Sequence, residues 1–484
     1  MIYTSSKQRL ITSLFFAAVF LLFCIFFINM HPLFPYDCDD WRFMSYNRIA
    51  MPSIHQWNPG KVFPELLFAY VSNLAAYTVY PLCGDYFKAQ TLVHGIVVSL
   101  FISVYFYAFY RLLVKRFSVE RYQGMILTTL FLLLHFLVMR VDEQSNAHLF
   151  YTSDLCCYYH YIIPNVLNAT LVLTLLERDW LKSPQMSLTK GGFVLLVVYL
   201  AVFSNLYCAS ILTIFLGCQL LVGLIGGGKK LEYTKKHWLK IVIILMFFLF
   251  AAFEAIGQRS GMATTEAKGA SLGAQLIKAV ANLPQVRINS IFLLLATACT
   301  GYGVWYSIRK KRLAPVALTL MATTVVTLLY IVLLSAKVNP AYVLRPDILF
   351  SVCFPLMLLI MLAFVALCRE QKKAAIFLPL LMLFVFSRAN TRLSTFKDLG
   401  AQYGDMEVLQ RINKNIFQQV IDASHLPKGD SITFVVPDAN NTELDNWPFY
   451  VSTMTTVSRT LEKHGVIPQH LSQDAIIGKS IEDY

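Results

Sequence analysis

The chain has 484 residues, of which 57% are hydrophobic and only 14% are charged. Apolar runs of about eighteen residues or more recur along its first four-fifths, which excludes a soluble globular protein and indicates repeated membrane spans. The formal net charge of +13 does not indicate nucleic-acid binding, because Lys and Arg cluster in short segments between apolar runs, where they orient helices.

The first apolar run follows "MIYTSSKQRL" and is too long for a signal-peptide core, so it predicts a retained helix whose basic end is cytoplasmic. In chain order, the predicted spans are residues 10–29, 88–111, 122–139, 160–177, 191–207, 209–227, 239–256, 288–307, 314–335, 347–368 and 374–388.

Five basic connectors separate these spans and fix the predicted topology. All five fall on one side of the membrane, which the positive-inside rule assigns to the cytoplasm: 111–121, 177–190, 229–240, 309–312 and 369–373. The segment 62–83 is also long enough to cross. If it crossed, the later basic connectors would move to the opposite side, so we expect a helix in the outer interface, with a true span as the alternative.

The chain therefore divides into two predicted parts. Residues 1–388 form a transmembrane module, in which 30–87 is the first outer loop with interfacial helices. The more polar residues 389–484 form a small extracytoplasmic domain, either α/β or mostly helical. Its pattern predicts helices at 406–426 and 447–465 and a strand at 431–438.

The stretch "PYDCDDWRF" places Asp37, Asp39 and Asp40 just after the first span. One interpretation is structural, because Asp39 or Asp40 can cap a short helix that begins near them. The other is chemical. Neighbouring, partly buried carboxylates raise each other's pKa, which suits a general base, or they can bind a hard divalent cation.

Isolated charged residues near the same face are candidates for binding an anionic group. Lys61 follows the turn "NPG", and Arg345 in "AYVLRPDIL" stands where a short outer loop enters a span. Each either extends towards the headgroups or clamps a phosphate. Arg259 is a weaker candidate, and Glu254, an acid near the end of a span, is either functional or paired with Arg259.

The outer loop "MRVDEQSNAHLFYTSDLCCYYHYIIPN" (139–165) is dense in polar and aromatic residues. His148, Tyr159 and His160 are candidates for stacking on a sugar and hydrogen-bonding to it, and an aromatic interfacial belt is the alternative. The ten cysteines show no metal-ligand spacing, and a disulfide from Cys38 stays open.

The motifs "DCDDW", "NPGK", "YYHYIIPN" and "LRPDILF", together with the order of spans, loops and outer C-terminal domain, resemble the GT-C class of membrane glycosyltransferases. The resemblance is to a bacterial branch that includes O-antigen-type glucosyltransferases. It implies an all-α polytopic fold with about eleven transmembrane helices and a multi-pass protein of the bacterial inner membrane. The architectural resemblance covers nearly the whole chain, whereas its specific motifs are these four segments.

The resemblance further implies a polyprenyl-phosphate-linked sugar as donor and a glycan or lipid acceptor, with inverting transfer. Asp39 and Asp40 match the acid pair of the class best, and one of the three acids would deprotonate or orient the acceptor hydroxyl. Arg345 would bind the donor phosphate, and Lys61 and Arg259 are the next candidates for this role. The branch often has Arg where this chain has Lys61. Some members use a divalent metal, which Asp39 and Asp40 would hold.

Two other functions are weighed against this one. An envelope polysaccharide polymerase or ligase usually has a large outer loop between late spans, whereas the large outer segment here is the C-terminus. A transporter of lipid-linked glycans should place charges deep within its spans, whereas the acids and arginines here gather at the outer ends.

Overall fold

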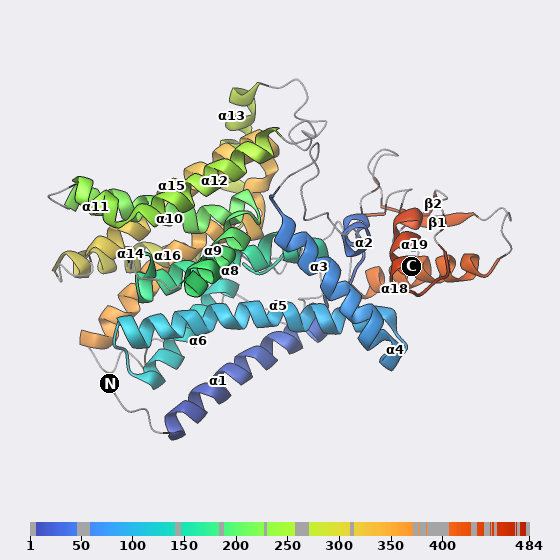
Figure 1. Ribbon diagram of the computed structural model, residues 1–484, viewed down its shortest axis with the longest axis horizontal. Helices are drawn as coiled ribbons and strands as arrows, with labels where there is room; N and C mark the ends of the chain where they lie inside the picture. The colour runs from blue at the N-terminus through green and yellow to red at the C-terminus, as the bar shows by residue number, and fades with distance from the viewer. Residues whose placement is uncertain are drawn as a thin grey trace.

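The computed structural model describes most of the chain as α-helix (Figure 1). The described residues are 6–45, 59–140, 147–182, 188–226, 230–256, 271–309, 314–370, 377, 384, 406–426, 433–439, 446, 448–449, 453–469, 471 and 475–480. The helices before the C-terminal domain are α1 (Ser6–Ile25), α2 (Cys38–Ser45), α3 (Val62–Leu74), α4 (Tyr80–Cys83), α5 (Tyr86–Arg111), α6 (Arg121–Leu137), α7 (Leu155–Cys157), α8 (Ile163–Glu177), α9 (Leu188–Val202), α10 (Leu206–Gly226), α11 (Lys230–Lys236), α12 (Trp238–Ile256), α13 (Leu272–Asn282), α14 (Ser290–Arg309), α15 (Ala314–Val338) and α16 (Pro346–Glu370).

Eight helices are long and apolar enough to cross a membrane, several of them lengthened by π-helical turns. They are Ser6–Met30, Val62–Cys83, Tyr86–Arg116, Leu155–Glu177, Leu206–Gly226, Trp238–Ile256, Ala314–Val338 and Pro346–Glu370. Shorter apolar helices cover the predicted spans at 122–139, 191–207 and 288–307. The predicted polytopic helical fold is confirmed. The predicted span at 374–388 lies outside the described residues, apart from 377 and 384.

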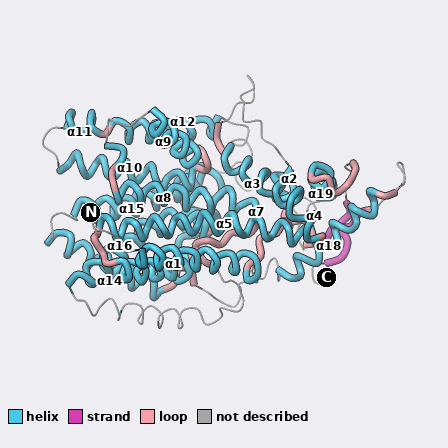
Figure 2. Tube along the Cα trace, turned by 60° about the horizontal axis from the view of Figure 1, so that its bottom comes forward, coloured by secondary structure: helices cyan, strands magenta, loops and turns pink. Residues whose placement is uncertain are grey.

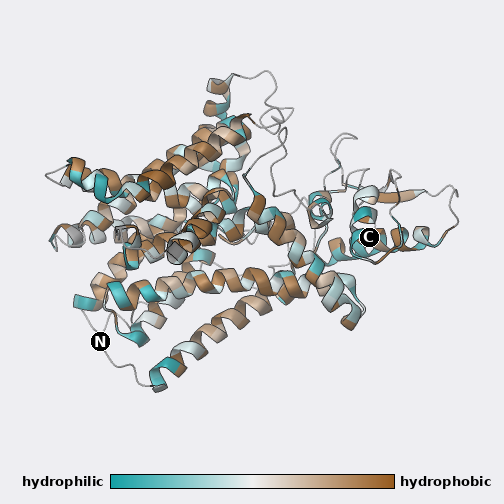
Figure 3. Ribbon diagram, in the orientation of Figure 1, coloured by the Kyte–Doolittle hydropathy of each residue, from teal (hydrophilic) through white to brown (hydrophobic). Residues whose placement is uncertain are grey.

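The spanning helices run side by side (Figure 1). The end where α5 and α8 finish and α12 begins carries Arg111 and Lys240, and we call it the basic end. Arg111 of α5 pairs with Glu177 of α8 at 2.8 Å, and the buried Lys240 of α12 pairs with Asp179 at 2.7 Å. Apolar residues fill the middle of the bundle, as Figure 3 shows. We call the opposite end, where α2 lies, the carboxylate end. The predicted gathering of the basic connectors at one end is thus found, as far as they are described.

Helix α16 occupies the centre of the bundle, since 89% of its most apolar window is buried. Side chains on all sides of it are enclosed, so its sequence is apolar all round rather than amphipathic. Its first turn opens at the carboxylate end, directly after Arg345. A residue placed there is held by the most deeply buried of the eight candidate spans that the structure describes.

The continuous helix 62–83, which contains α3 and α4, lies antiparallel to only the first half of α5. Phe63 packs near Phe101 (ring centroids 6.3 Å apart), and Tyr80 near Tyr86 (5.7 Å). With a rise of about 1.5 Å per residue, Phe63 therefore lies roughly 15 Å short of Arg111 at the basic end. A bilayer core is about 30 Å thick, so this placement favours a helix that dips into one leaflet, as the charge pattern predicts.

The C-terminal domain is a small α/β unit at the carboxylate end (Figures 1 and 2). It contains α18 (Met406–Ser424), β1 (Phe434–Asp438), α19 (Thr453–Lys463) and β2 (Ala475–Ser480). The two helices and β1 were predicted from periodicity. Strand β2 was not, and it pairs parallel to β1 with Phe434 opposite Ala475. A parallel pair needs a crossover, which α19 supplies.

Helix α19 joins this domain to α2. The Thr460 hydroxyl donates to the Trp41 carbonyl at 2.5 Å, and the Lys463 ammonium donates to the Ser45 carbonyl at 2.5 Å. The two helices therefore lie side by side and point in the same direction. Helix α2 is thus held between the spanning bundle and the C-terminal domain.

Candidate active site

The three acids of the first loop occupy different environments at the N-terminus of α2. One carboxylate oxygen of Asp37 accepts the Asp39 backbone N–H at 2.6 Å. Asp40 reaches back, and its Oδ2 accepts the backbone N–H groups of Tyr36 and Asp37, both at 3.1 Å. Its Oδ1 accepts the Cys156 backbone N–H at 2.6 Å. Asp37 and Asp40 therefore cap α2 reciprocally, which satisfies backbone donors that a helix start leaves open.

This geometry separates the possible roles of the acids. Both oxygens of the fully buried Asp40 are occupied by backbone donors, which suits a positioning role. The Asp39 side chain is exposed. The buried Asp37 has one oxygen, Oδ2, with no hydrogen-bond partner among the described residues. Such an oxygen is costly to bury unless it receives a proton donor from a ligand or water. Asp37 is thus the acid best placed to act on a bound hydroxyl.

Burial raises the pKa of the Asp37 carboxyl well above its usual range, and the carboxylates of Asp154 and Asp40 raise it further. For Asp40, burial and Asp154 also raise the pKa, whereas its three backbone N–H donors oppose the rise. A carboxylate whose pKa is raised is a stronger base than an exposed one. Asp37 has this property together with an available oxygen.

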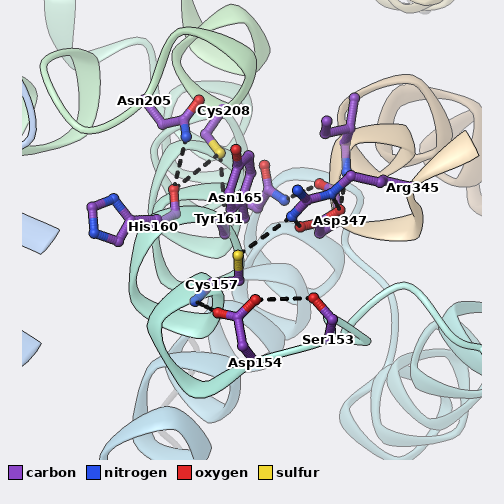
Figure 4. A network of polar contacts seen from close by, with 11 residues as sticks. Ser153, Asp154, Cys157, His160, Tyr161, Asn165, Asn205, Cys208, Arg345 and Asp347 are labelled. Carbon is purple, nitrogen blue, oxygen red and sulfur yellow. Dashed lines mark hydrogen bonds and ion pairs between the residues drawn. The ribbon is translucent and has the colours of Figure 1, made fainter. Parts of the chain in front are cut away.

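Asp154 caps a second helix, α7, whose N-terminus lies next to that of α2. Its Oδ1 accepts the Cys157 backbone N–H at 2.6 Å, and its Oδ2 accepts the Ser153 hydroxyl at 2.9 Å (Figure 4). Asp154 thereby caps α7, while Asp40 accepts the N–H of Cys156 in the same turn. The N-termini of α2 and α7 are therefore fixed to each other through carboxylates, and their positive ends stabilise the acids.

Two further polar atoms near these acids are buried without a hydrogen-bond partner among the described residues, the Tyr36 hydroxyl and the Thr152 hydroxyl. Burial raises the pKa of Tyr36, and Asp154 raises it further. Tyr36 therefore stays protonated and can donate. Buried polar atoms that lack partners usually face a site for water or a ligand.

Arg345 lies next to this region, at the start of α16 (Figure 4). Its Nε and Nη2 donate to the buried Asp347 carboxylate at 3.1 and 2.5 Å. Nη2 also donates to the Cys157 sulfur at 3.4 Å, which links the guanidinium to the turn capped by Asp154. The guanidinium carbon lies 4.5 Å from the Tyr161 ring centroid and 5.1 Å from that of Tyr342.

These contacts fix Arg345 as a permanent cation. Burial alone would lower the pKa of Arg345, but the Asp347 carboxylate reverses this and the pKa lies above its usual value. The hydrogen bonds to Asp347 and Cys157 use Nε and Nη2 and leave Nη1 to other partners. Asp347 therefore binds one edge of the planar Arg345 guanidinium, and the remaining N–H donors can bind an anionic oxygen.

The other predicted charged residues form a separate pair. The Lys61 ammonium lies 3.0 Å from the Glu254 carboxylate, with both side chains largely buried. The backbone N–H of Lys61 donates to the Phe203 carbonyl at 2.6 Å. Arg259 lies outside the described residues. Glu254 is thus paired with Lys61, whereas its predicted pairing with Arg259 involves a residue outside the described ones. A phosphate at Lys61 would have to compete with this carboxylate.

The predicted sugar-binding residues are buried in contacts between elements. The Tyr159 hydroxyl bonds to the His94 Nδ1 at 2.6 Å. His148 is enclosed by aromatic rings, and burial, with His31 contributing, lowers its pKa so that it stays neutral. The His160 carbonyl accepts from the Asn205 amide at 3.1 Å. These placements favour packing roles for all three.

The acids do not fit the predicted metal site. Among the described residues, no group of three or more His, Cys, Asp or Glu side chains is placed to hold a metal ion. Asp39 is exposed, and both Asp40 oxygens already accept backbone N–H groups. All ten cysteines are free thiols, and Cys38 lies 3.9 Å from the Thr456 hydroxyl rather than in a disulfide.

Sequence reasoning missed Tyr36, Thr152 and Asp347 as members of this site. Only Asp347 carried a signal, since it stands two residues after Arg345 in the first turn of a buried helix, where an unpaired acid is costly. Tyr36 and Thr152 carried none, because nothing in the sequence indicates which hydroxyls are left without a partner.

The chain matches no family profile and no curated protein. Its structure is similar to the crystal structure of an oligosaccharyltransferase from Archaeoglobus fulgidus in complex with zinc and sulfate, with a TM-score of 0.49. The match has 11% sequence identity, and it covers 95% of this chain and 62% of the other. The chain thus spans about three-fifths of the length of that protein. Similarity at this level assigns neither a substrate nor site residues.

Proposed function

We propose that this protein is a GT-C-type glycosyltransferase that moves a sugar from a polyprenyl phosphate to a hydroxyl of a glycan or lipid acceptor. One observation carries the proposal. At one end of a membrane-spanning bundle, a buried carboxylate with an available oxygen (Asp37) shares a contact network with a fixed cation (Arg345). The connection runs from Asp37 through Asp40 to the turn at Cys156 and Cys157, whose Cys157 sulfur accepts from Arg345. In the proposal, this pair supplies the base and the phosphate ligand that such a transfer needs.

In the proposed reaction, Asp37 accepts the proton of the acceptor hydroxyl through Oδ2. The acceptor oxygen forms a bond to the anomeric carbon while the bond from that carbon to the phosphate oxygen breaks. The electron pair leaves with the polyprenyl phosphate, whose growing negative charge Arg345 stabilises. A phosphate is a good leaving group, so no strong acid is needed. A single displacement of this kind inverts the anomeric configuration.

Asp40, Asp154 and Asp347 have positioning roles in this proposal. Asp40 and Asp154 fix the turns that carry Asp37 and Cys157, and Asp347 fixes the Arg345 fork. No step is assigned to a metal, because the acids do not fit one. By the positive-inside rule, we place the basic end in the cytoplasm of a bacterial cell and the carboxylate end, with the C-terminal domain of 389–484, outside.

The test is transfer of radiolabelled sugar by the purified protein in liposomes, with a panel of polyprenyl-phosphate sugars and glycan acceptors. Arg345→Lys keeps the positive charge beside the buried Asp347 but loses the planar guanidinium group. We expect it to fold and to lose about 10²- to 10³-fold in kcat. Arg309→Lys at the basic end, where the arginine stacks near Trp305, is the matched control and should keep its rate. Transfer by Arg345→Lys at the wild-type rate would refute the phosphate role.

A further inference from the structure

Helix α13 has an unusual distribution of side chains for a helix at the edge of a protein. Its large outward residues are mostly apolar, with Leu272, Ile277 and Val280 exposed by 61%, 72% and 49%, and Lys278 is the charged residue among them. Its polar Gln275 is buried at 7% exposure and faces the protein. A surface helix in water shows the reverse pattern, with polar residues outward. Apolar residues outward are typical of a helix in contact with lipid.

The place of α13 in the bundle agrees with this pattern. It stands across the direction of α12 and α15, at their carboxylate ends (Figure 1). Its inner residues Leu276 and Ala279 belong to a small hydrophobic cluster with Ile331 and Ala336 near the end of α15. The neighbouring outward residue of α15, Leu333, is 58% exposed and belongs to the apolar surface of a predicted span. The exposed face of α13 therefore continues the apolar surface that the spans present to the bilayer.

The same cluster supports the aromatic rings around Arg345. It packs α13 against Val343, and Tyr161 and Tyr342 lie against it. The Asn282 side chain of α13 also donates to the Pro340 carbonyl at 3.1 Å, at the start of the 3₁₀ turn Pro340–Leu344 that precedes Arg345. Helix α13 therefore helps to hold the turn that precedes Arg345, the candidate phosphate ligand.

We infer that α13 is an interfacial helix whose outward face lies among the lipid chains of the leaflet at the carboxylate end. This anchor holds the Arg345 loop at the level of the lipid headgroups, where the phosphate of a membrane-bound carrier arrives. The partner of this surface is the bilayer itself. The second part of the inference rests on the proposed function, whereas the membrane contact does not.

The experiment measures membrane contact directly. Nitroxide labels are placed singly at 277 and 280 in liposomes, in a Cys83→Ser background because Cys83 is exposed. Collision with oxygen, which concentrates in lipid, is compared with collision with a water-soluble nickel complex. Labels at Leu329, an exposed apolar residue of the span α15, and at Arg459, exposed on α19, give the lipid and water references. We expect the ratios at 277 and 280 to match the lipid reference, and ratios matching Arg459 would overturn the inference.

A second arm tests the link to the donor. Ile277→Asp places a charge on the outward face, with Ser271→Asp, at the exposed cap of the same helix, as the matched control. We expect Ile277→Asp to raise the KM for a long-chain donor about tenfold, the equivalent of about 1.4 kcal/mol, and to leave the KM for a short-chain soluble donor unchanged. Equal effects on both donors would refute the anchoring of Arg345 through lipid. Absence of transfer by wild type would refute the proposed function and leave the labelling result standing.

Discussion

Asparagine substitutions at Asp37 and Asp40 should have opposite consequences, although the two acids are three residues apart. In Asp37→Asn, the amide oxygen keeps the bond from the Asp39 N–H, and Asn is as good a helix cap as Asp. We expect the unfolding free energy to stay within about 0.5 kcal/mol of wild type. The oxygen that accepts the proton is lost, so we expect kcat to fall about 10²- to 10⁴-fold, or roughly 3 to 5 kcal/mol in the barrier.

In Asp40→Asn, by contrast, an amide NH₂ must face a backbone N–H, because all three partners of Asp40 are donors. At least one buried N–H loses its acceptor, and the charge that strengthened the other bonds is gone. We expect a loss of about 2 to 3 kcal/mol in stability.

The assay combines transfer kinetics in liposomes with thermal unfolding in detergent for wild type and both variants. The two effects should be separable, with Asp37→Asn stable and inactive and Asp40→Asn less stable. Activity of Asp37→Asn within threefold of wild type would refute its role as base. Full stability of Asp40→Asn would show that the reciprocal cap does not hold the two helix starts together.

Three further predictions follow from the same contacts. Because the Asp37 pKa is raised in the folded protein, its contribution to stability is full below the unfolded-state pKa of about 3.9 and is lost as pH rises through the folded pKa. The transfer rate should rise over that same interval, and Asp37→Asn should remove the rise in a pH–rate profile. Gly95→Ala should cost about 1 to 3 kcal/mol in thermal unfolding, since its new Cβ would lie 2.7 Å from Ile28 in the π-helical turn that continues α1. Gly217→Ala, with nothing within 4 Å, should cost nothing, and equal effects would contradict the close packing of α1 on α5. Thr460→Val should destabilise the C-terminal domain by about 1 kcal/mol, because it loses the hydroxyl that donates to α2. In limited proteolysis, Thr460→Ser, which keeps the hydroxyl, should give the wild-type cleavage pattern. A wild-type cleavage pattern for Thr460→Val would count against this contact.

Local patterns in the sequence determined the helices and the common end of their basic connectors. Apolar runs and short basic segments are properties of neighbouring residues, so they could be read without knowing any long-range contact. The capping interpretation of the first acidic loop was likewise local, since a cap and its donors lie within four residues. The helices and the first strand of the C-terminal domain followed from the same kind of periodicity.

Only the tertiary structure decided which of these residues meet. Strand β2 was missed because its pairing partner lies across a crossover helix. The sequence likewise did not show that Glu254 pairs with Lys61, 193 residues away. Asp37, rather than Asp39 or Asp40, keeps an available oxygen because Asp40 is used by Cys156, 116 residues further on. The physical reason is the same throughout. A carboxylate or an arginine can be recognised from sequence, whereas the donors that satisfy it are brought by other helices, and burial makes their presence or absence decisive.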